Sequence, residues 1–198
     1  MIRLVGNDVV DLRDRPSQPK AIHPRWDSRV FTSEELRRLA DSPSIHRERW
    51  RMWAAKEGAF KVAKKLVPGL PFFPTSFSVE LEGAVHATVV HDVGRFDVLL
   101  HETPECVHAV STPEGSPPAS SDLATVEGGP NLPSRSSEQV RDLARGALGR
   151  VLALDPADIE ISTVGGIPVV SSDGTPLPID LSLSHHGRFV ACAWVCSG

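Results

Sequence analysis

The feature that most limits the possible folds is a segment in the middle of the chain that cannot contribute to a packed core. Residues 111–137 contain 15 serine, proline or glycine residues in 27 positions. Such a composition buries too little apolar surface to offset the entropy lost on ordering, so the segment is predicted to be a mobile linker. The linker separates two structured parts, 1–110 and 138–198, in a chain of 198 residues.

The hydrophobic pattern of the first part predicts helices followed by antiparallel strands. Residues 4–12 form a short apolar run that is typical of a buried strand. A hydroxyl followed by two acids at residues 32–35 indicates the start of a short helix, and apolar residues recur every three or four positions from about 44 to 66. Between 76 and 110 the pattern changes to alternating or apolar runs separated by glycine turns, which indicates strands.

The second part has the same order of elements. A helix is predicted at about 137–153, and strands are predicted at 159–164, 180–184 and 189–195. No sequence repeat relates the two parts, so their similarity lies in the element order alone. We therefore predict a pseudo-duplicated α+β fold with two similar helix-plus-antiparallel-sheet halves.

Composition argues against two cellular locations. No run approaches the roughly 20 apolar residues that span a bilayer, and no signal peptide is visible, so neither a membrane role nor export is expected. The three cysteines lack the spacing of metal ligands, and Cys192 and Cys196 are predicted to be buried in the last apolar run. This usage is typical of a reducing compartment, so we expect a cytoplasmic protein.

The charges are unevenly distributed along the chain. Residues 1–65 hold 15 basic and 9 acidic side chains, whereas the remaining residues hold 6 and 16. The basic part suits an anionic ligand or an acidic protein partner, although a solvated helical face would have the same composition. No nucleic-acid-binding motif accompanies the charge, so a nucleic-acid partner is not expected.

Two acidic residues of the first part could form a metal site. Asp8 lies in an apolar run, where a carboxylate costs free energy unless it is paired, exposed at a strand end or bound to a cation. Glu57 shares one helix face with Trp53 and Lys61, since these residues are each four apart. Asp8 and Glu57 could together supply two oxygen ligands to Mg²⁺. Alternatively, Glu57 and Lys61 could form a surface ion pair, and Asp8 could cap a turn.

A third segment, residues 180–188, carries hydroxyls and histidines at the end of a strand. Strand alternation places Ser182 and Ser184 on one face and leaves His185 where the turn begins. A histidine in this position could donate to a phosphate. It could equally be a histidine at the rim of the sheet, without a role in binding.

Taken together and in order, these segments resemble the 4′-phosphopantetheinyl transferase superfamily. The motifs are Gly6-x-Asp8-x-x-Asp11, Phe31-Thr32-x-x-Glu35, Trp53-x-x-Lys56-Glu57-x-x-x-Lys61, Gly166-Ile167-Pro168 and Ser182-Leu183-Ser184-His185. Their order is that of the short holo-acyl-carrier-protein synthase type, while two helix–sheet units are typical of the longer type. The resemblance therefore implies a 4′-phosphopantetheinyl transferase fold, in which two halves in permuted order form a monomeric pseudodimer with the active site between them.

The resemblance also implies an activity and a role for each motif residue. Such an enzyme moves 4′-phosphopantetheine from coenzyme A to a serine of an acyl or peptidyl carrier protein and releases 3′,5′-ADP. Asp8 and Glu57 would bind Mg²⁺, and Glu57 would also act as the base that deprotonates the carrier serine. Lys61 would contact a phosphate or the developing charge, and Ser184 and His185 would bind the phosphate groups of coenzyme A.

The sequence departs from the family pattern at the coenzyme A contacts. Ile167 stands where many long-type members have a lysine, and Arg25, Arg29 or Arg188 could compensate for the lost charge. Asp11 matches the short type but is expected on the opposite face of its strand from Asp8. Two alternatives to the enzyme remain. One is a non-catalytic homologue that binds a carrier protein or coenzyme A, and the other is a fold that carries these residues for structural reasons.

Overall fold

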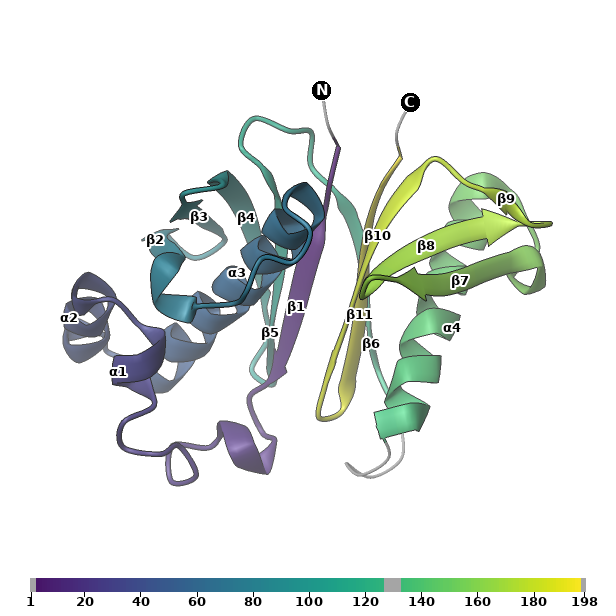
Figure 1. Ribbon diagram of the computed structural model, residues 1–198. Helices are drawn as coiled ribbons and strands as arrows, with labels where there is room; N and C mark the ends of the chain where they lie inside the picture. The colour runs from purple at the N-terminus through teal and green to yellow at the C-terminus, as the bar shows by residue number, and fades with distance from the viewer. Residues whose placement is uncertain (1–2, 127–132, 197–198) are drawn as a thin grey trace.

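The computed structural model describes residues 3–126 and 133–196, and it contains two α+β halves that meet along two strands (Figure 1). The first half comprises β1 (Gly6–Asp11), α1 (Asp27–Val30), α2 (Ser33–Asp41), α3 (Ile45–Leu66), β2 (Ser78–Glu82), β3 (His86–His91), β4 (Gly94–Glu102) and β5 (Cys106–Pro113). The second comprises β6 (Ser120–Thr125), α4 (Pro133–Leu152), β7 (Ile159–Val164), β8 (Ile167–Ser172), β9 (Thr175–Pro176), β10 (Ile179–His186) and β11 (Phe189–Cys196).

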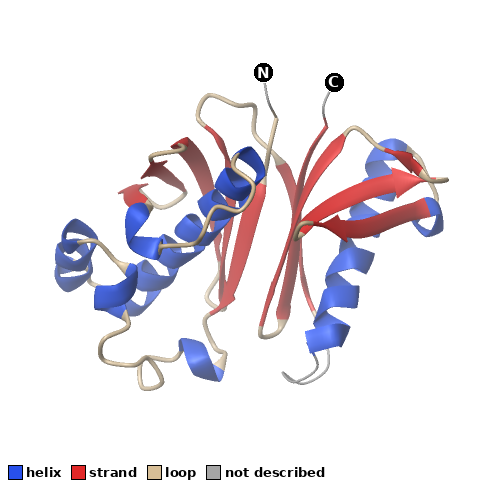
Figure 2. Ribbon diagram, viewed as in Figure 1, coloured by secondary structure: helices blue, strands red, loops and turns tan. Residues whose placement is uncertain are grey.

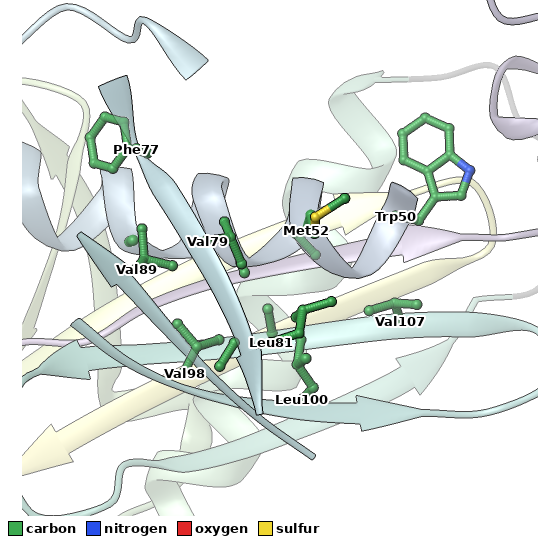
Figure 3. Close-up of a cluster of buried hydrophobic side chains, with 14 of the residues drawn as sticks. Trp50, Met52, Phe77, Val79, Leu81, Val89, Val98, Leu100 and Val107 are labelled. Carbon is green, nitrogen blue, oxygen red and sulfur yellow. The ribbon is translucent and has the colours of Figure 1, made fainter. Parts of the chain in front are cut away.

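The first half is an antiparallel five-stranded sheet covered by α3. Its strand order is β1-β5-β4-β3-β2, and α3 crosses one face of it (Figure 2). The predicted apolar face of α3 is buried there: Met52, Ala55, Ala59 and Val62 have no exposed surface. Figure 3 shows Met52 and Trp50 of this helix above the buried valines and leucines of the sheet. The periodicity of the sequence therefore predicted both the helix and the face that it buries.

Close packing of α3 on β1 and β5 depends on two glycines. A Cβ atom added at Gly6 would lie 2.0 Å from the carbonyl oxygen of Gly58, and one added at Gly58 would lie 2.6 Å from Oγ of Ser111. A larger residue at Gly6 would therefore collide with the backbone of α3, and one at Gly58 would displace the side chain of Ser111 in β5. The helix that carries Glu57 consequently lies directly on the strand that carries Asp8.

The second half repeats the connectivity of the first. In each half a strand precedes the long helix and then pairs with the last strand of the half: β1 pairs with β5, and β6 pairs with β11. The remaining strands form the sheets β10-β11-β6 and β7-β8-β9, with α4 packed on them (Figure 1). This arrangement confirms the predicted α+β class with two similar halves.

The prediction of a linker at 111–137 was wrong for most of its length. Residues 111–113 end β5, residues 120–125 form β6, and α4 begins at Pro133. Residues 127–132, which also belong to the predicted linker, lie outside the described residues. β6 forms because its backbone pairs with β11 from Phe189 to Trp194, and this pairing needs little apolar surface.

Two further results concern surface and membrane properties. Cys192 is buried, as predicted, but Cys196 is exposed, because it ends the last strand beyond the core. No helix within residues 3–126 and 133–196 is both long and apolar enough to cross a membrane.

The halves meet where β1 and β10 run side by side in parallel. Three backbone N–H groups of β1, and that of Val5 just before it, donate hydrogen bonds to side chains of β10. In each of these four contacts, the donor and acceptor residues are 175 positions apart in the sequence. These hydrogen bonds join Val5 to Asp180 Oδ2 (2.7 Å), Asn7 to Ser182 Oγ (2.9 Å), Val9 to Ser184 Oγ (2.9 Å) and Asp11 to His186 Nδ1 (3.0 Å). Side chains of β10 thus take the place of a neighbouring strand along the open edge of β1.

Candidate functional site

Asp8 lies inside β1 at the junction between the halves. Its Oδ1 atom accepts hydrogen bonds from Oγ of Ser184, at 3.1 Å, and from Nζ of Lys61, at 3.3 Å. The side chain is 15% exposed, so one side of the carboxylate still faces the surroundings. Because Asp8 lies within a strand and its carboxylate accepts no backbone N–H in the described part of the chain, it does not cap a turn.

Glu57 is the second acidic residue of the site, and its carboxylate has no partner in the part of the chain that the structure describes. Among the described residues, no side chain or backbone group donates a hydrogen bond to its carboxylate, and no cation lies within ion-pair distance. Burial raises the pKa of Glu57 to about 7, the negative charge of Asp8 also raises it, and Lys61 lowers it. A carboxylate that is partly buried, unpaired and repelled by a neighbouring acid is a poor structural group. The proposed surface ion pair between Glu57 and Lys61 is not formed in these residues.

The donor set of Asp8 and Glu57 fits a magnesium ion. Residues 3–126 and 133–196 contain no group of three or more histidine, cysteine or acidic side chains that could enclose a metal ion on their own. Mg²⁺ is usually bound by only one or two carboxylates and completes its octahedron with water and substrate phosphates. A nearby cation would also satisfy the unpartnered carboxylate of Glu57 and offset its repulsion by Asp8.

Two lysines of α3 connect the halves at the site. Nζ of Lys61 donates to the carbonyl of Asn7 in β1 at 2.6 Å and lies 3.5 Å from the carbonyl of Leu183 in β10. One turn later, Nζ of Lys65 donates to the carbonyls of Val5 and Leu181, at 2.7 and 2.9 Å. Lys61 therefore has a structural contact as well as a position beside both acids.

A cavity of about 320 Å³ opens beside the two acids, between α3, α4 and β10. Glu57 and Lys61 line it from the first half, and His185 lines it from the second. Burial lowers the pKa of His185, and the charge of Lys61 lowers it further, whereas the charge of Asp8 raises it. Three of the five predicted site residues, Glu57, Lys61 and His185, thus line the cavity, while Asp8 contacts Lys61 and Ser184 contacts Asp8.

Two cations that were not predicted as site residues also line this cavity. Lys64 has no hydrogen-bond or ion-pair partner among the described residues, and a Cβ added at Gly166 would lie 2.7 Å from its Nζ. Among the described residues, Arg141 of α4 donates only to neutral groups, namely Ser137 and, at 3.3 Å, Oγ1 of Thr163. Two cations that form no ion pair among the described residues favour a ligand with negative charge.

A signal for Lys64 was present in the sequence. Lys61, Lys64 and Lys65 follow Glu57 by four, seven and eight positions, so all of them lie on one face of α3. Nothing comparable marks Arg141, because its place at the cavity depends on how the halves dock.

Arg188, which could have replaced the missing lysine at position 167, contacts Asp11 instead. Two nitrogens of its guanidinium donate to the two carboxylate oxygens, each at 2.9 Å, and the Asp11 side chain is 1% exposed. Burial alone would raise the pKa of Asp11, but the hydrogen bonds from Arg188 and from the backbone of Arg13 lower it to about 2. Asp11 is therefore occupied by a structural ion pair. Arg25 and Arg29 are not among the residues that line the cavity.

Comparison with known proteins gives one family. Residues 4–116, more than half of the chain, match the model of the 4′-phosphopantetheinyl transferase superfamily, and this stretch contains Asp8, Glu57 and Lys61. Among solved structures, the holo-[acyl-carrier-protein] synthase of Thermotoga maritima is similar at 14% sequence identity, with a TM-score of 0.45 over 89% of this chain and 86% of that chain. No curated protein sequence matches.

Proposed function

Because the chain belongs to the 4′-phosphopantetheinyl transferase superfamily, we propose that it transfers 4′-phosphopantetheine from coenzyme A to a serine of an acyl or peptidyl carrier protein. The observation that carries the proposal is that Glu57, which has no hydrogen-bond or ion-pair partner among the described residues, lines a cavity together with Lys61, Lys64 and Arg141, and that Asp8 contacts Lys61 at 3.3 Å. Acids that can hold a cation beside a basic cavity suit a substrate with several phosphates.

Asp8 and Glu57 would hold Mg²⁺, which when bound offsets the charge of the coenzyme A pyrophosphate as the leaving group departs. Glu57 would also take the proton of the carrier serine, since a carboxylate with a pKa of about 7 can accept a proton at neutral pH. The serine oxygen then forms a bond to the phosphorus of the phosphopantetheine arm, and the bond from that phosphorus to 3′,5′-ADP breaks. Lys61 would stabilise negative charge near Asp8.

We assign the other phosphates of coenzyme A to the two cations of the cavity, Lys64 and Arg141, and to His185. His185, Lys64 and Arg141 approach it from three different elements, so they can contact separate phosphate groups. Lys64 lies beside Gly166, next to the position where Ile167 replaces the lysine of other family members. This cation supports the enzyme over the non-catalytic homologue, because it restores a positive charge at that turn.

The partner that carries the serine would dock on a basic surface beside the acids. Five exposed cations of the segment after β1 have no acidic partner within 4 Å among the described residues. These are Arg15, Lys20, Arg25, Arg29 and Arg37. Trp26, next to Arg25, packs on Trp53, which precedes Glu57 by one helical turn. Such a surface suits an acidic carrier protein. Since one chain supplies both sides of the site, we propose that the enzyme acts as a monomer.

The proposal is tested by mixing the protein with coenzyme A, Mg²⁺ and apo carriers of fatty acid, polyketide and nonribosomal peptide synthesis, one at a time. We expect release of 3′,5′-ADP with at least one of them. Binding of coenzyme A without release on any carrier would support the non-catalytic homologue instead.

A further inference from the structure

The hydroxyl of Ser184 has its orientation fixed by two contacts. The backbone N–H of Val9 donates to Oγ at 2.9 Å, and an N–H can only donate, so this contact uses a lone pair of the oxygen. The hydroxyl proton must therefore point elsewhere, and Oδ1 of Asp8 lies 3.1 Å away. Ser184 is 6% exposed, so water cannot readily replace either contact.

These contacts fix one side of the Asp8 carboxylate and leave the other side available. Oδ1 accepts from both Ser184 and Lys61, whereas Oδ2 accepts from no group in residues 3–126 and 133–196. Two donors on one oxygen hold the rotation of the carboxylate. Oδ2 is then the atom that remains for a cation.

We propose that Ser184 is a positioning residue that orients Asp8 for metal binding from the opposite half of the molecule. This inference rests on the proposed function, because Asp8 is taken as a metal ligand. It differs from the role that the sequence motif implies, in which Ser184 contacts coenzyme A itself. The site is accordingly complete only when β10 lies against β1.

Ser182 provides a matched control. Its Oγ accepts the backbone N–H of Asn7 at 2.9 Å, and it is 2% exposed, so it forms the same kind of contact one step earlier along the same two strands. Its hydroxyl is not hydrogen-bonded to Asp8 among the described residues. Replacing Ser182 or Ser184 by alanine therefore removes equivalent contacts between the halves, but only one of these changes releases Asp8.

The test measures Mn²⁺ affinity of the full-length protein by titration calorimetry in the absence of coenzyme A, for the wild type, Ser184→Ala and Ser182→Ala. We expect Ser184→Ala to weaken Mn²⁺ binding about tenfold, a typical loss when a group that orients a metal ligand is removed. Ser182→Ala should bind Mn²⁺ as the wild type does. Circular dichroism and thermal unfolding of both variants establish that the fold is retained.

Equal weakening in the two variants would overturn the proposal, since the effect would then come from the junction as a whole. Unchanged Mn²⁺ affinity in Ser184→Ala would also overturn the proposal. If the KM for coenzyme A were increased in the same variant, Ser184 would instead be a residue that contacts coenzyme A. The Mn²⁺ titrations require no carrier protein, so failure to find a modified carrier would count against the proposed function and leave this result standing.

Discussion

Nζ of Lys56 lies 2.8 Å from Oε2 of Glu35, and the two side chains are 0% and 2% exposed. Glu35 also completes the N-terminal cap of α2 by accepting the backbone N–H of Thr32, and it accepts that of Val79 at 2.7 Å. Burial lowers the pKa of Lys56, while the charge of Glu35 raises it. The lysine and the acid next to it in the sequence motif thus have different roles: Lys56 holds α3 to α2 and β2, and Glu57 faces the cavity.

Replacing Lys56 by methionine should destabilise the protein without touching the cavity. The change leaves the carboxylate of Glu35 buried without its cation, which typically costs about 3–5 kcal/mol. Urea denaturation followed by circular dichroism measures this loss. Lys20→Met, at an exposed position, is the control and should change the free energy of unfolding by less than about 0.5 kcal/mol. A similar stability of both variants would show that the buried pair is not required.

Replacing Lys64 or Arg141 by alanine should weaken binding of the released nucleotide. Each change removes a cation without a carboxylate partner from the cavity, so we expect the Kd for 3′,5′-ADP to rise about tenfold, with the larger effect at low salt. Titration calorimetry measures the affinity. Arg145→Ala is the matched control, because Arg145 lies on the same helix but pairs with Asp142 away from this cavity. Equal affinity in all three variants would exclude the cavity as the phosphate site.

The pair Asp11–Arg188 should make the stability of the protein depend on acid pH. The pKa of Asp11 is lowered from 3.8 to about 2, so its contribution is fully present above pH 4 and is lost as the pH falls through 2. We expect Asp11→Asn to cost on the order of 1–2 kcal/mol at pH 6, since part of Arg188 is exposed, and less at pH 3. Chemical denaturation at both pH values measures the difference. A deficit in Asp11→Asn that stays constant between pH 6 and pH 3 would contradict the assignment.

If the carrier protein docks on the basic segment after β1, charge reversal there should change the KM for the carrier but not that for coenzyme A. Reversing two charges with Arg25→Glu and Arg29→Glu should increase the KM for an acidic carrier about tenfold or more and leave the KM for coenzyme A unchanged. Arg95→Glu on β4 changes one charge at a position that already has an acidic neighbour, Glu114, and serves as the control. If the KM for the carrier changed equally in the double variant and in Arg95→Glu, the basic segment after β1 would not be the docking surface.

Much of the fold could be predicted because its signals are local. The helix expected at about 44–66 is α3, Ile45–Leu66, since its apolar face has the helical period and Pro68-Gly69 follows it. The linker prediction failed because β6 is polar and its one large apolar residue, Leu123, is 37% exposed. Its stability comes from backbone pairing with β11, and composition does not record which backbone groups pair.

The site was predictable only in part for a similar reason. The sequence motifs indicated Asp8, Glu57 and His185, and the fold brings them to one place. The contact between Ser184 and Asp8 depends on the register of β10 against β1, which spans 176 positions in the sequence and has no local signal. Arg141 likewise lines the cavity only because α4 packs beside α3 in the folded protein.

The most direct measurement is the intact mass of an apo carrier protein after incubation with coenzyme A, Mg²⁺ and either the wild type or Glu57→Gln. The wild type should add the mass of one phosphopantetheine to the carrier. Glu57→Gln should be slower by at least about a hundredfold and should unfold no more easily than the wild type, because it removes an unpaired, partly buried charge. An unchanged carrier mass with every carrier tested, or near-normal transfer by Glu57→Gln, would contradict the account.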